Sequence, residues 1–227
     1  ISKVLEEAES LKKMGVTFTK PTIDIDLVRD WKNKVVSQLS GGIGQMAKAR
    51  SVNTIQAEAT FLSDNEVQLK SESSTETITF DYCIIASGSS SSIIPGIPFD
   101  NENVLTSKTA LDLKKIPESL LVIGGGYIGL EMGTVFSALG SSVSVAEFLP
   151  NLLPGADPDL VKPLARKLKK EFNEIHLSTK ITKVEQAKSG VMDVTMEKNG
   201  EEITKQYEQV LISVGRKPNT EKMGVGK

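Results

Sequence analysis

The sequence has little of the two residue types that many hydrolytic and metal-dependent sites require. Cys83 is the only cysteine and His176 the only histidine among 227 residues. A single cysteine excludes an internal disulfide and a multi-cysteine metal site. A single histidine argues against hydrolytic triads and histidine-based zinc sites. We therefore expect no metal site here, interpret His176 as structural or solvated, and place Cys83 in the core.

Long apolar runs and an excess of charge of one sign are also missing. No stretch approaches the roughly 20 apolar residues of a membrane helix. The 27 basic and 29 acidic residues are scattered and nearly cancel. Neither a membrane nor a nucleic acid is therefore an expected partner. The content of 39% hydrophobic and 25% charged residues is typical of globular proteins.

The first half of the chain predicts two helices. The first covers residues 2–14. The second is long and amphipathic, and Asp24 or Asp26 can cap its start, because a carboxylate accepts hydrogen bonds from free backbone N–H groups there. Its Gly41-Gly42 pair costs helix stability and predicts a kink or close packing. The apolar face of this helix is marked by Leu27, Trp31, Val35 and Leu39.

Short strands follow. Residues 53–80 alternate as in a small antiparallel meander, and residues 82–86 predict a buried strand that contains Cys83. Residues 93–103 are rich in Pro, Gly and Asn and predict a loop. The chain starts at Ile1 in a helix-like pattern and stops at Lys227 soon after a strand-like run. We therefore expect it to be an internal piece of a longer protein.

The second half alternates between strands and helices, which predicts an α/β fold with a parallel sheet and right-handed crossovers. One helix should cover Tyr127–Leu139, with Gly140 as its C-terminal cap. A charged helix should cover Asp157–Phe172, and residues 180–207 resemble a hairpin region. The predicted parallel strands are SLLVIGG, SSVSVAEF, EIHLST and EQVLISVG.

The segment LLVIGGGYIGLEMG contains the pattern G-x-G-x-x-G between a predicted strand and a predicted helix. Such a turn binds the pyrophosphate of a dinucleotide. Gly124 would make the tight turn, Gly126 would let the pyrophosphate approach the backbone, and Gly129 would let helix and strand pack closely. The alternative is a glycine-rich structural turn with no ligand. Gly125, Tyr127 and Ile128 complete the candidate binding turn.

An acidic residue about 20 positions after the turn is the test of this motif. Glu147 stands there, at the end of the next predicted strand. A carboxylate accepts hydrogen bonds from ribose hydroxyls and would repel the 2′-phosphate of NADP, and no basic residue lies near enough in sequence to offset it. The turn is therefore expected to prefer NAD or FAD over NADP.

Four segments together carry a family resemblance over essentially the whole chain. They are DIDLVRDWKNKVVSQLSGGIGQMAK, DYCIIASGS, LLVIGGGYIGLEMGTVFSALGSSVSVAE and VLISVGRKPNT. The chain resembles the pyridine nucleotide–disulfide oxidoreductases, and within them the branch that oxidises dihydrolipoamide. Members hold FAD with a first glycine turn and NAD(P) with a second. The resemblance implies that Gly124–Gly129 is the second turn and binds NAD.

The resemblance also implies contacts with FAD. Ser87, Gly88 and Ser89 match a turn at which the family's chains leave the FAD-binding domain, with Ser87 in place of the usual threonine. Ala59 matches a backbone position near the flavin adenine, where the family more often has glycine. An ordinary polar turn is the alternative for residues 87–89.

Other positions carry over to the nicotinamide nucleotide. Gly215 would face the nicotinamide ribose with its backbone. Arg216 would brace the domain junction or approach the flavin. Ile181 resembles an apolar position near the NAD adenine, although it fits plain core equally well. Glu131 matches a residue that orients the nicotinamide, against the alternative of a solvated helix residue. Tyr127 stands where related reductases carry a lid over the flavin.

The expected fold is thus a Rossmann-like NAD-binding domain, a parallel sheet plus β-meander, at residues 115–227. It is preceded by the C-terminal part of an FAD-binding domain at residues 1–114. The resemblance implies electron transfer from dihydrolipoamide through an enzyme disulfide and FAD to NAD. The redox cysteine pair and the catalytic histidine are missing from these residues, so no catalytic residue is expected in this chain.

The resemblance further implies a homodimer, and lipoyl domains of 2-oxo acid dehydrogenase complexes as partners. It favours the cytoplasm, or the mitochondrial matrix in a eukaryote. Two alternatives stay open. One is a sister flavoenzyme such as mercuric reductase or soluble transhydrogenase. The other is a non-catalytic NAD-binding module.

Overall fold

The computed structural model describes residues 2–19 and 21–224, so Ile1 and Lys227, the outer ends of the two predicted domains, lie outside the described residues. The chain divides into two compact units, each built from two segments. The first combines Ile1–Arg29 with Ser91–Gly215, and the second combines Asp30–Ser90 with Arg216–Lys227. The division expected near residue 114 remains a prediction, although the sheet of the first unit already begins at Val104.

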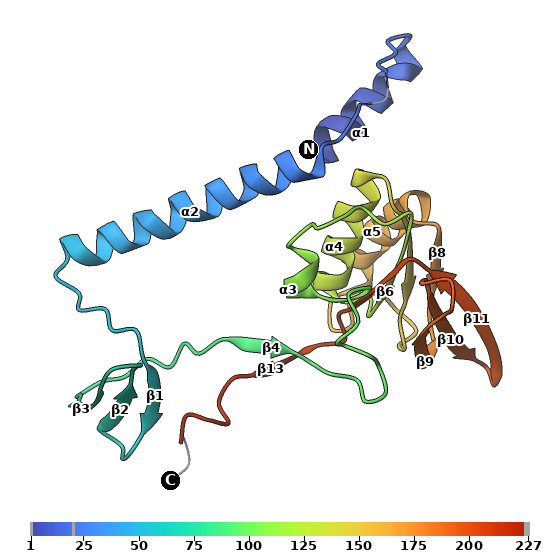
Figure 1. The fold of residues 1–227 in the computed structure, drawn as a ribbon. Helices are drawn as coiled ribbons and strands as arrows, with labels where there is room; N and C mark the ends of the chain where they lie inside the picture. Colours follow the sequence, from blue (N-terminus) through green and yellow to red (C-terminus); the bar gives the residue numbers. More distant parts are fainter. Residues whose placement is uncertain (1, 20, 225–227) are drawn as a thin grey trace. The chain divides into compact units, whose positions relative to one another are not determined.

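A five-stranded parallel sheet organises the first unit (Figure 1). Its order is β5-β12-β6-β7-β8, so the last strand in sequence lies between the first two. The strand β5 was not predicted, because it is only three residues long and lies at an edge. The bounds are β5 Val104–Thr106, β6 Ser119–Ile123, β7 Ser142–Ala146, β8 Glu174–His176 and β12 Gln209–Ile212.

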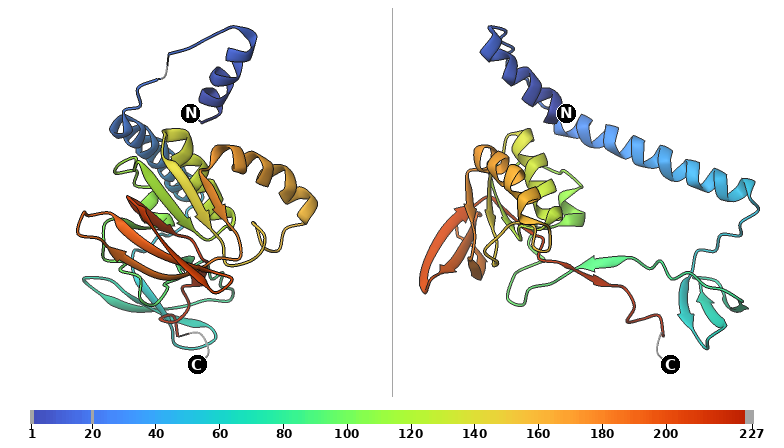
Figure 2. Two further views of the ribbon diagram at one scale, coloured as in Figure 1. Left: turned by 90° about the vertical axis from the view of Figure 1, so that its right-hand side faces the viewer. Right: turned by 180° about the vertical axis from the view of Figure 1, so that it is seen from behind.

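Two layers cover this sheet, as Figures 1 and 2 show. The helices α3 (Ser107–Ala110), α4 (Tyr127–Leu139) and α5 (Pro158–Glu171) lie on one face. An antiparallel sheet lies on the other, with β10 (Met192–Lys198) between β9 (Lys180–Gln186) and β11 (Glu201–Tyr207). The α/β class and the parallel sheet with its meander are confirmed.

The central strands are covered on both faces because successive side chains of a strand point to opposite faces of the sheet. Leu120 and Val122 of β6 belong to the buried cluster under the helices. Leu121 and Ile123 of the same strand belong to the cluster under the antiparallel sheet. A strand buried on both faces reads as a continuous apolar run, which is why SLLVI was recognisable in the sequence.

The helix after β6 has the bounds that the sequence predicted. Gly140 ends α4 in the left-handed conformation, at φ 113°, and its N–H donates to carbonyls of the last helical turn. Asp157 precedes α5, and Pro158 occupies the first helical position, where its missing N–H costs nothing. The bounds of both helices are therefore set largely by local sequence signals.

The second unit contains most of the long helix α2 (Ile25–Ala49) and a three-stranded antiparallel sheet. Asp24 caps α2, since its carboxylate accepts a hydrogen bond from the Leu27 N–H at 3.0 Å. The predicted meander is confirmed. Its strands are β1 Glu58–Phe61, β2 Glu66–Lys70 and β3 Thr75–Thr79, and the short strands β4 (Ser89–Ser91) and β13 (Arg216–Pro218) pair separately.

The chain starts with α1 (Ser2–Ser10) and a 3₁₀ turn over Leu11–Met14, as predicted. Among the described helices, none combines the length and the apolar character that a membrane crossing needs.

Two expectations for the second unit are wrong. Residues 82–86 form no strand, and Cys83 is exposed, because no described strand pairs with this segment and an unpaired strand leaves its backbone groups to water. The helix α2 continues unbroken through Gly41 and Gly42. A Cβ at either glycine would meet no described atom within 4 Å, so close packing does not explain them.

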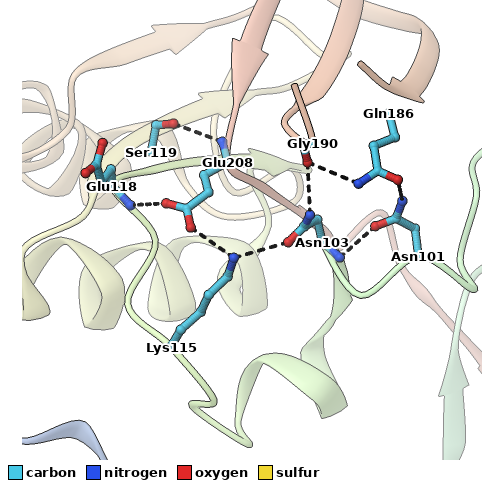
Figure 3. A network of polar contacts seen from close by, with 8 residues as sticks. All are labelled: Asn101, Asn103, Lys115, Glu118, Ser119, Gln186, Gly190 and Glu208. Atoms are coloured by element: carbon cyan, nitrogen blue, oxygen red, sulfur yellow. Dashed lines mark hydrogen bonds and ion pairs between the residues drawn. The ribbon is translucent and has the colours of Figure 1, made fainter. Parts of the chain in front are cut away.

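A polar network joins the amino ends of β5, β6 and β12 to the loop between β9 and β10 (Figure 3). Glu208 is its centre. Its carboxylate accepts a hydrogen bond from Lys115 Nζ at 2.9 Å and another from the Glu118 backbone N–H at 2.6 Å. Lys115 also donates to Asn103, whose amide reaches the carbonyl of Gly190 at 3.2 Å. The network therefore fixes the antiparallel sheet to the parallel one.

We expect Glu208→Gln to lower the free energy of unfolding by about 1 kcal/mol at neutral pH. Partial burial raises the pKa of Glu208, but the bonds from Lys115 and Glu118 outweigh it, so the pKa is lowered overall. The stabilisation is therefore complete above the pKa of the unfolded chain and is lost as the pH falls through the folded pKa.

Urea unfolding across the acidic range measures this. The exposed Glu118→Gln variant is the matched control, because only the backbone of Glu118 joins the network. A Glu208→Gln protein whose stability falls with acid as steeply as the natural protein would contradict the assignment.

Candidate dinucleotide-binding site

Three strand ends meet at one place in the first unit. The chain turns at Gly124 after β6, while Glu147 follows β7 and Ser213 follows β12, the two neighbours of β6 in the sheet. From β6 the chain passes to β7 and β8 on one side, and it later returns to β12 on the other side of β6. Such a switch point leaves a crevice beyond the carboxyl ends of the strands, which is where open parallel sheets bind ligands.

Two glycines of the turn are required by close contacts. Gly124 adopts φ 108°, and a Cβ there would lie 2.5 Å from the carbonyl oxygen of Ser213. A Cβ on Gly129 would overlap the carbonyl oxygen of Gly124 and would lie 2.5 Å from Ser213 Oγ. Both positions therefore exclude any larger residue, and Gly129 holds α4 close to the strand as the motif predicts.

Gly126 is different, because its surroundings are open. A Cβ there would meet no described atom within 4 Å, and its φ of −75° is one that any residue adopts. Gly126 is the N-cap of α4 and offers no side chain to the free N–H groups of the first turn. These N–H groups and the positive end of the helix dipole are therefore left for an anion that can approach the bare backbone.

Glu147 is buried beside the turn, with 7% of its surface exposed. One carboxylate oxygen accepts a hydrogen bond from the Gly125 N–H at 2.6 Å, and the other accepts one from the Leu149 N–H at 2.7 Å. Each carboxylate oxygen has a second lone pair for another donor. Glu147 thus holds the turn in place and keeps acceptor capacity for a ribose hydroxyl.

Sequence reasoning missed Ser213. Its hydroxyl lies within hydrogen-bond distance of the carbonyls of Ile123 and Gly124, at 3.0 and 3.2 Å. It therefore ties the turn to the neighbouring strand β12. A polar residue that ends an apolar strand run was the only signal in the sequence.

The helical residues of the motif differ in how far they are exposed. Tyr127 begins α4 and is 65% exposed, Ile128 is half-buried, and Glu131 is exposed one turn further on. An exposed aromatic ring at the start of this helix is free to contact a ligand or a neighbouring group. The roles of Tyr127 and Glu131 toward a flavin remain predictions.

Ile181 and Gly215, two other residues predicted to contact NAD, take no part in the hydrogen bonds that hold the glycine turn. Ile181 lies on β9 and packs against the buried cluster between the two sheets, which fits its alternative reading as core. Gly215 is exposed at φ 131°, and its carbonyl accepts a hydrogen bond from the Ser92 N–H at 3.0 Å. Both contacts remain predictions.

The predicted FAD contacts belong to the second unit. Ala59 lies on β1, and the carbonyl of Gly88 accepts a hydrogen bond from the Asn219 N–H at 3.0 Å. The carbonyl of Ser87 accepts a hydrogen bond from the Asn219 side chain at 3.1 Å, and Arg216 donates to the hydroxyl of Ser89 at 2.7 Å. Asn219, which sequence reasoning missed, therefore helps to fix the turn that contains Gly88.

His176 is a structural residue in this fold. Its Nε2 lies 2.7 Å from a carboxylate oxygen of Glu174, which also pairs with Lys205. The bond from Lys205 lowers the pKa of the Glu174 carboxyl against the opposing effect of burial, and His176 adds to the lowering. No group of three potential ligands gathers around a metal position among residues 2–19 and 21–224.

Comparison with known proteins places the whole chain in one group. A family model described as pyridine nucleotide-disulphide oxidoreductase matches residues 1–226. The dihydrolipoyl dehydrogenase of Vibrio cholerae is 42% identical over 220 residues, which cover 96% of this chain and 46% of that protein. The enzymes of the same name from Haemophilus influenzae and Bacillus subtilis are 41% and 40% identical, over 100% and 97% of this chain and 47% of each protein.

A solved structure has the same fold. The flavoprotein disulfide reductase RclA from Escherichia coli, as its Cu(II) complex, aligns with a TM-score of 0.75 at 23% identity. The alignment covers 98% of this chain and 48% of RclA. The chain thus spans about half the length of the relatives that it matches.

Proposed function

The chain belongs to the pyridine nucleotide-disulphide oxidoreductase family, and from this premise we propose that it is the NAD-binding part, with an adjoining FAD-contacting part, of a dihydrolipoyl dehydrogenase. The observation that carries the proposal is the turn Gly124–Gly129, with Glu147 bonded to it and open space at Gly126. The relatives named dihydrolipoyl dehydrogenase, at about 40% identity, support the specific branch.

The residues of the turn fit the NAD pyrophosphate. The open backbone at Gly126 admits phosphate oxygens to the N–H groups at the start of α4. Glu147 would accept a hydrogen bond from the adenosine ribose and repel a 2′-phosphate through its charge. Gly215 and Ile181 would add contacts at the nicotinamide ribose and at the adenine. Glu131, exposed on α4, would orient the nicotinamide.

FAD would relay electrons as a hydride to NAD when bound. The turn Ser87–Ser89, tied by Asn219 and Arg216, and the backbone at Ala59 are the proposed contributions of the second unit. The cysteine pair that exchanges electrons with dihydrolipoamide would lie in the half of the relatives' length that this chain does not match. We further propose a homodimer that serves lipoyl domains in the cytoplasm, or in the matrix of a mitochondrion.

The activity test uses the complete natural protein. It is expected to reduce NAD with dihydrolipoamide and to reduce NADP far more slowly. Oxidation of NADPH by Hg(II) and transfer between NADPH and NAD are the parallel assays, because they separate mercuric reductase and transhydrogenase from the proposed enzyme. A protein active only in one of these two assays would overturn the assignment, and a protein that binds NADH without any of the three activities would indicate a binding module.

The preference for NADH over NADPH is expected to depend on Glu147. Glu147→Gln removes the charge that repels a 2′-phosphate. Its amide keeps one acceptor oxygen and loses one of the two backbone hydrogen bonds, which affects both nucleotides alike. The NADPH dissociation constant divided by that for NADH should therefore fall by about tenfold. Titrations of the complete protein with NADH and NADPH measure this. Equal affinity for both nucleotides in the natural protein would remove the role given to Glu147. Glu118→Gln is the matched control, since the side chain of Glu118 is exposed and the residue precedes β6, at the opposite end of the strand from the turn.

Tyr127 is proposed to shield the flavin until a nicotinamide displaces it. Its ring is exposed at the first position of α4, so a substitution is not expected to disturb packing. The Tyr127→Val variant of the complete protein should show flavin fluorescence that iodide quenches more efficiently. If iodide quenched the variant and the natural protein equally and the NADH kinetics were unchanged, the Tyr127 ring would not cover the flavin.

A further inference from the structure

A cavity of about 410 Å³ lies next to the dinucleotide turn but opens between other elements. Its walls come from the loop after β7, from one face of α5 and from β8. Pockets that bind small molecules usually have volumes of about 300–1,000 Å³ and mostly apolar walls. The apolar side chains that define this one include Leu149, Leu153, Val161, Ala165, Ile175 and Leu177.

The charges at the cavity have one sign. Lys162 and Lys169 line it from α5, and no aspartate or glutamate is among the lining residues. The two lysines are two helical turns apart, which is about 10 Å along the axis, so they share one face of α5. Neither pairs with an acidic side chain in the described part of the chain, whereas Lys167 pairs with Glu171 at 3.5 Å.

The cavity is separate from the nucleotide site, although the loop after β7 borders both. The Leu153 N–H donates to the carbonyl of Gly125 at 2.9 Å, and the Leu149 N–H donates to Glu147. These backbone bonds hold the loop against the turn, and the side chains of the same two leucines line the cavity. None of Gly124, Gly126 and Glu147 lines it, so an occupant would not displace the dinucleotide.

The geometry points to a binding site for a linear amphipathic carboxylate, with its alkyl chain among the leucines of the loop and α5 and its carboxylate at Lys162 or Lys169. The apolar lining favours a hydrocarbon chain, because burial of apolar surface removes it from water. Two unpaired lysines and no carboxylate favour an anionic head group. A cationic amphiphile of the same length is disfavoured by the charge of the lysines, and a neutral one lacks a charged partner for them.

Decanoate is the probe, used below its micelle concentration and titrated calorimetrically into the complete natural protein. Saturable binding with one site per chain is expected. Decanol and decyltrimethylammonium should bind about tenfold more weakly, since each lacks the charge-assisted hydrogen bonds to lysine. Decanol that binds as tightly as decanoate would show that the cavity does not select an anion and would overturn the proposal.

Variants locate the site. The double variant Lys162→Gln with Lys169→Gln should weaken decanoate binding about tenfold, while Lys170→Gln, an exposed lysine of α5 outside the cavity, should not change it. Ala165→Phe should abolish binding by filling the space. Because both lysines are exposed, the double variant is expected to fold even if the phenylalanine variant does not. Equal affinity in the double variant and in Lys170→Gln would overturn the proposal.

Discussion

Gly126→Ala is expected to leave the stability of the fold unchanged and to weaken NADH binding by at least about tenfold. A methyl group at Gly126 meets no described atom within 4 Å, and its φ of −75° suits alanine. The same methyl group would occupy the open face through which the pyrophosphate must reach the backbone N–H groups of α4. The variant therefore separates the requirement for binding from the requirement for folding.

Titration with NADH and urea unfolding of the same preparation measure both effects. Gly42→Ala is the matched control, because it is the same substitution in the helix α2, where a Cβ also meets no described atom within 4 Å. If Gly126→Ala bound NADH with natural affinity, the pyrophosphate would not lie against this backbone. The glycine turn would then be the ligand-free structural turn that the sequence left open.

Gly129→Ala is expected to have the larger effect on folding, a loss of about 3 kcal/mol in the free energy of unfolding. Its Cβ would overlap the carbonyl oxygen of Gly124 and crowd Ser213 Oγ at 2.5 Å and Val122 Cγ1 at 3.0 Å. Two of these three neighbours belong to the turn and the central strand, which are buried and cannot move without breaking the sheet. Relief would require α4 to move away from β6.

The control for this variant is Gly44→Ala, the same substitution in the exposed helix α2. A Cβ there has open space, and alanine favours a helix by about 1 kcal/mol over glycine, so stability should stay equal or rise. Urea unfolding compares the two variants. Equal stability of Gly129→Ala and the natural protein would mean that α4 does not pack this closely on the sheet.

The sequence predicted those elements of the fold whose bounds depend on residues close together in the chain. The helix α4 was predicted with its bounds because Gly126 and Gly140 delimit it and an apolar strand precedes it. The central strands were predicted because burial on both faces makes them continuously apolar. The short strand β5 was not, because three residues at an edge carry no such pattern and depend on β12 for their pairing.

The candidate site was predicted in its glycines and in Glu147, but not in how its parts are held. The motif gave the position of a carboxylate near a ribose. It gave no indication that both carboxylate oxygens accept hydrogen bonds from backbone N–H groups. Gly125 is 22 residues from Glu147 and is brought to it by the fold, and the bond from the nearby Leu149 depends on how the loop after β7 turns. Ser213 was missed for the same reason. It is remote from the turn in sequence and meets it through the pairing of β12 with β6.

The position of β12 in the sheet has a consequence for synthesis of the protein on the ribosome. The chain makes β5 and β6 first, but β12 must enter between them after all other strands of the unit have appeared. Ser213, which fastens the glycine turn, arrives directly after it. A nascent chain therefore carries the complete glycine motif long before it can hold the motif in shape. During that interval the facing edges of β5 and β6 leave the backbone N–H and C=O groups that pair with β12 without a partner, and such unpaired edges are prone to aggregation.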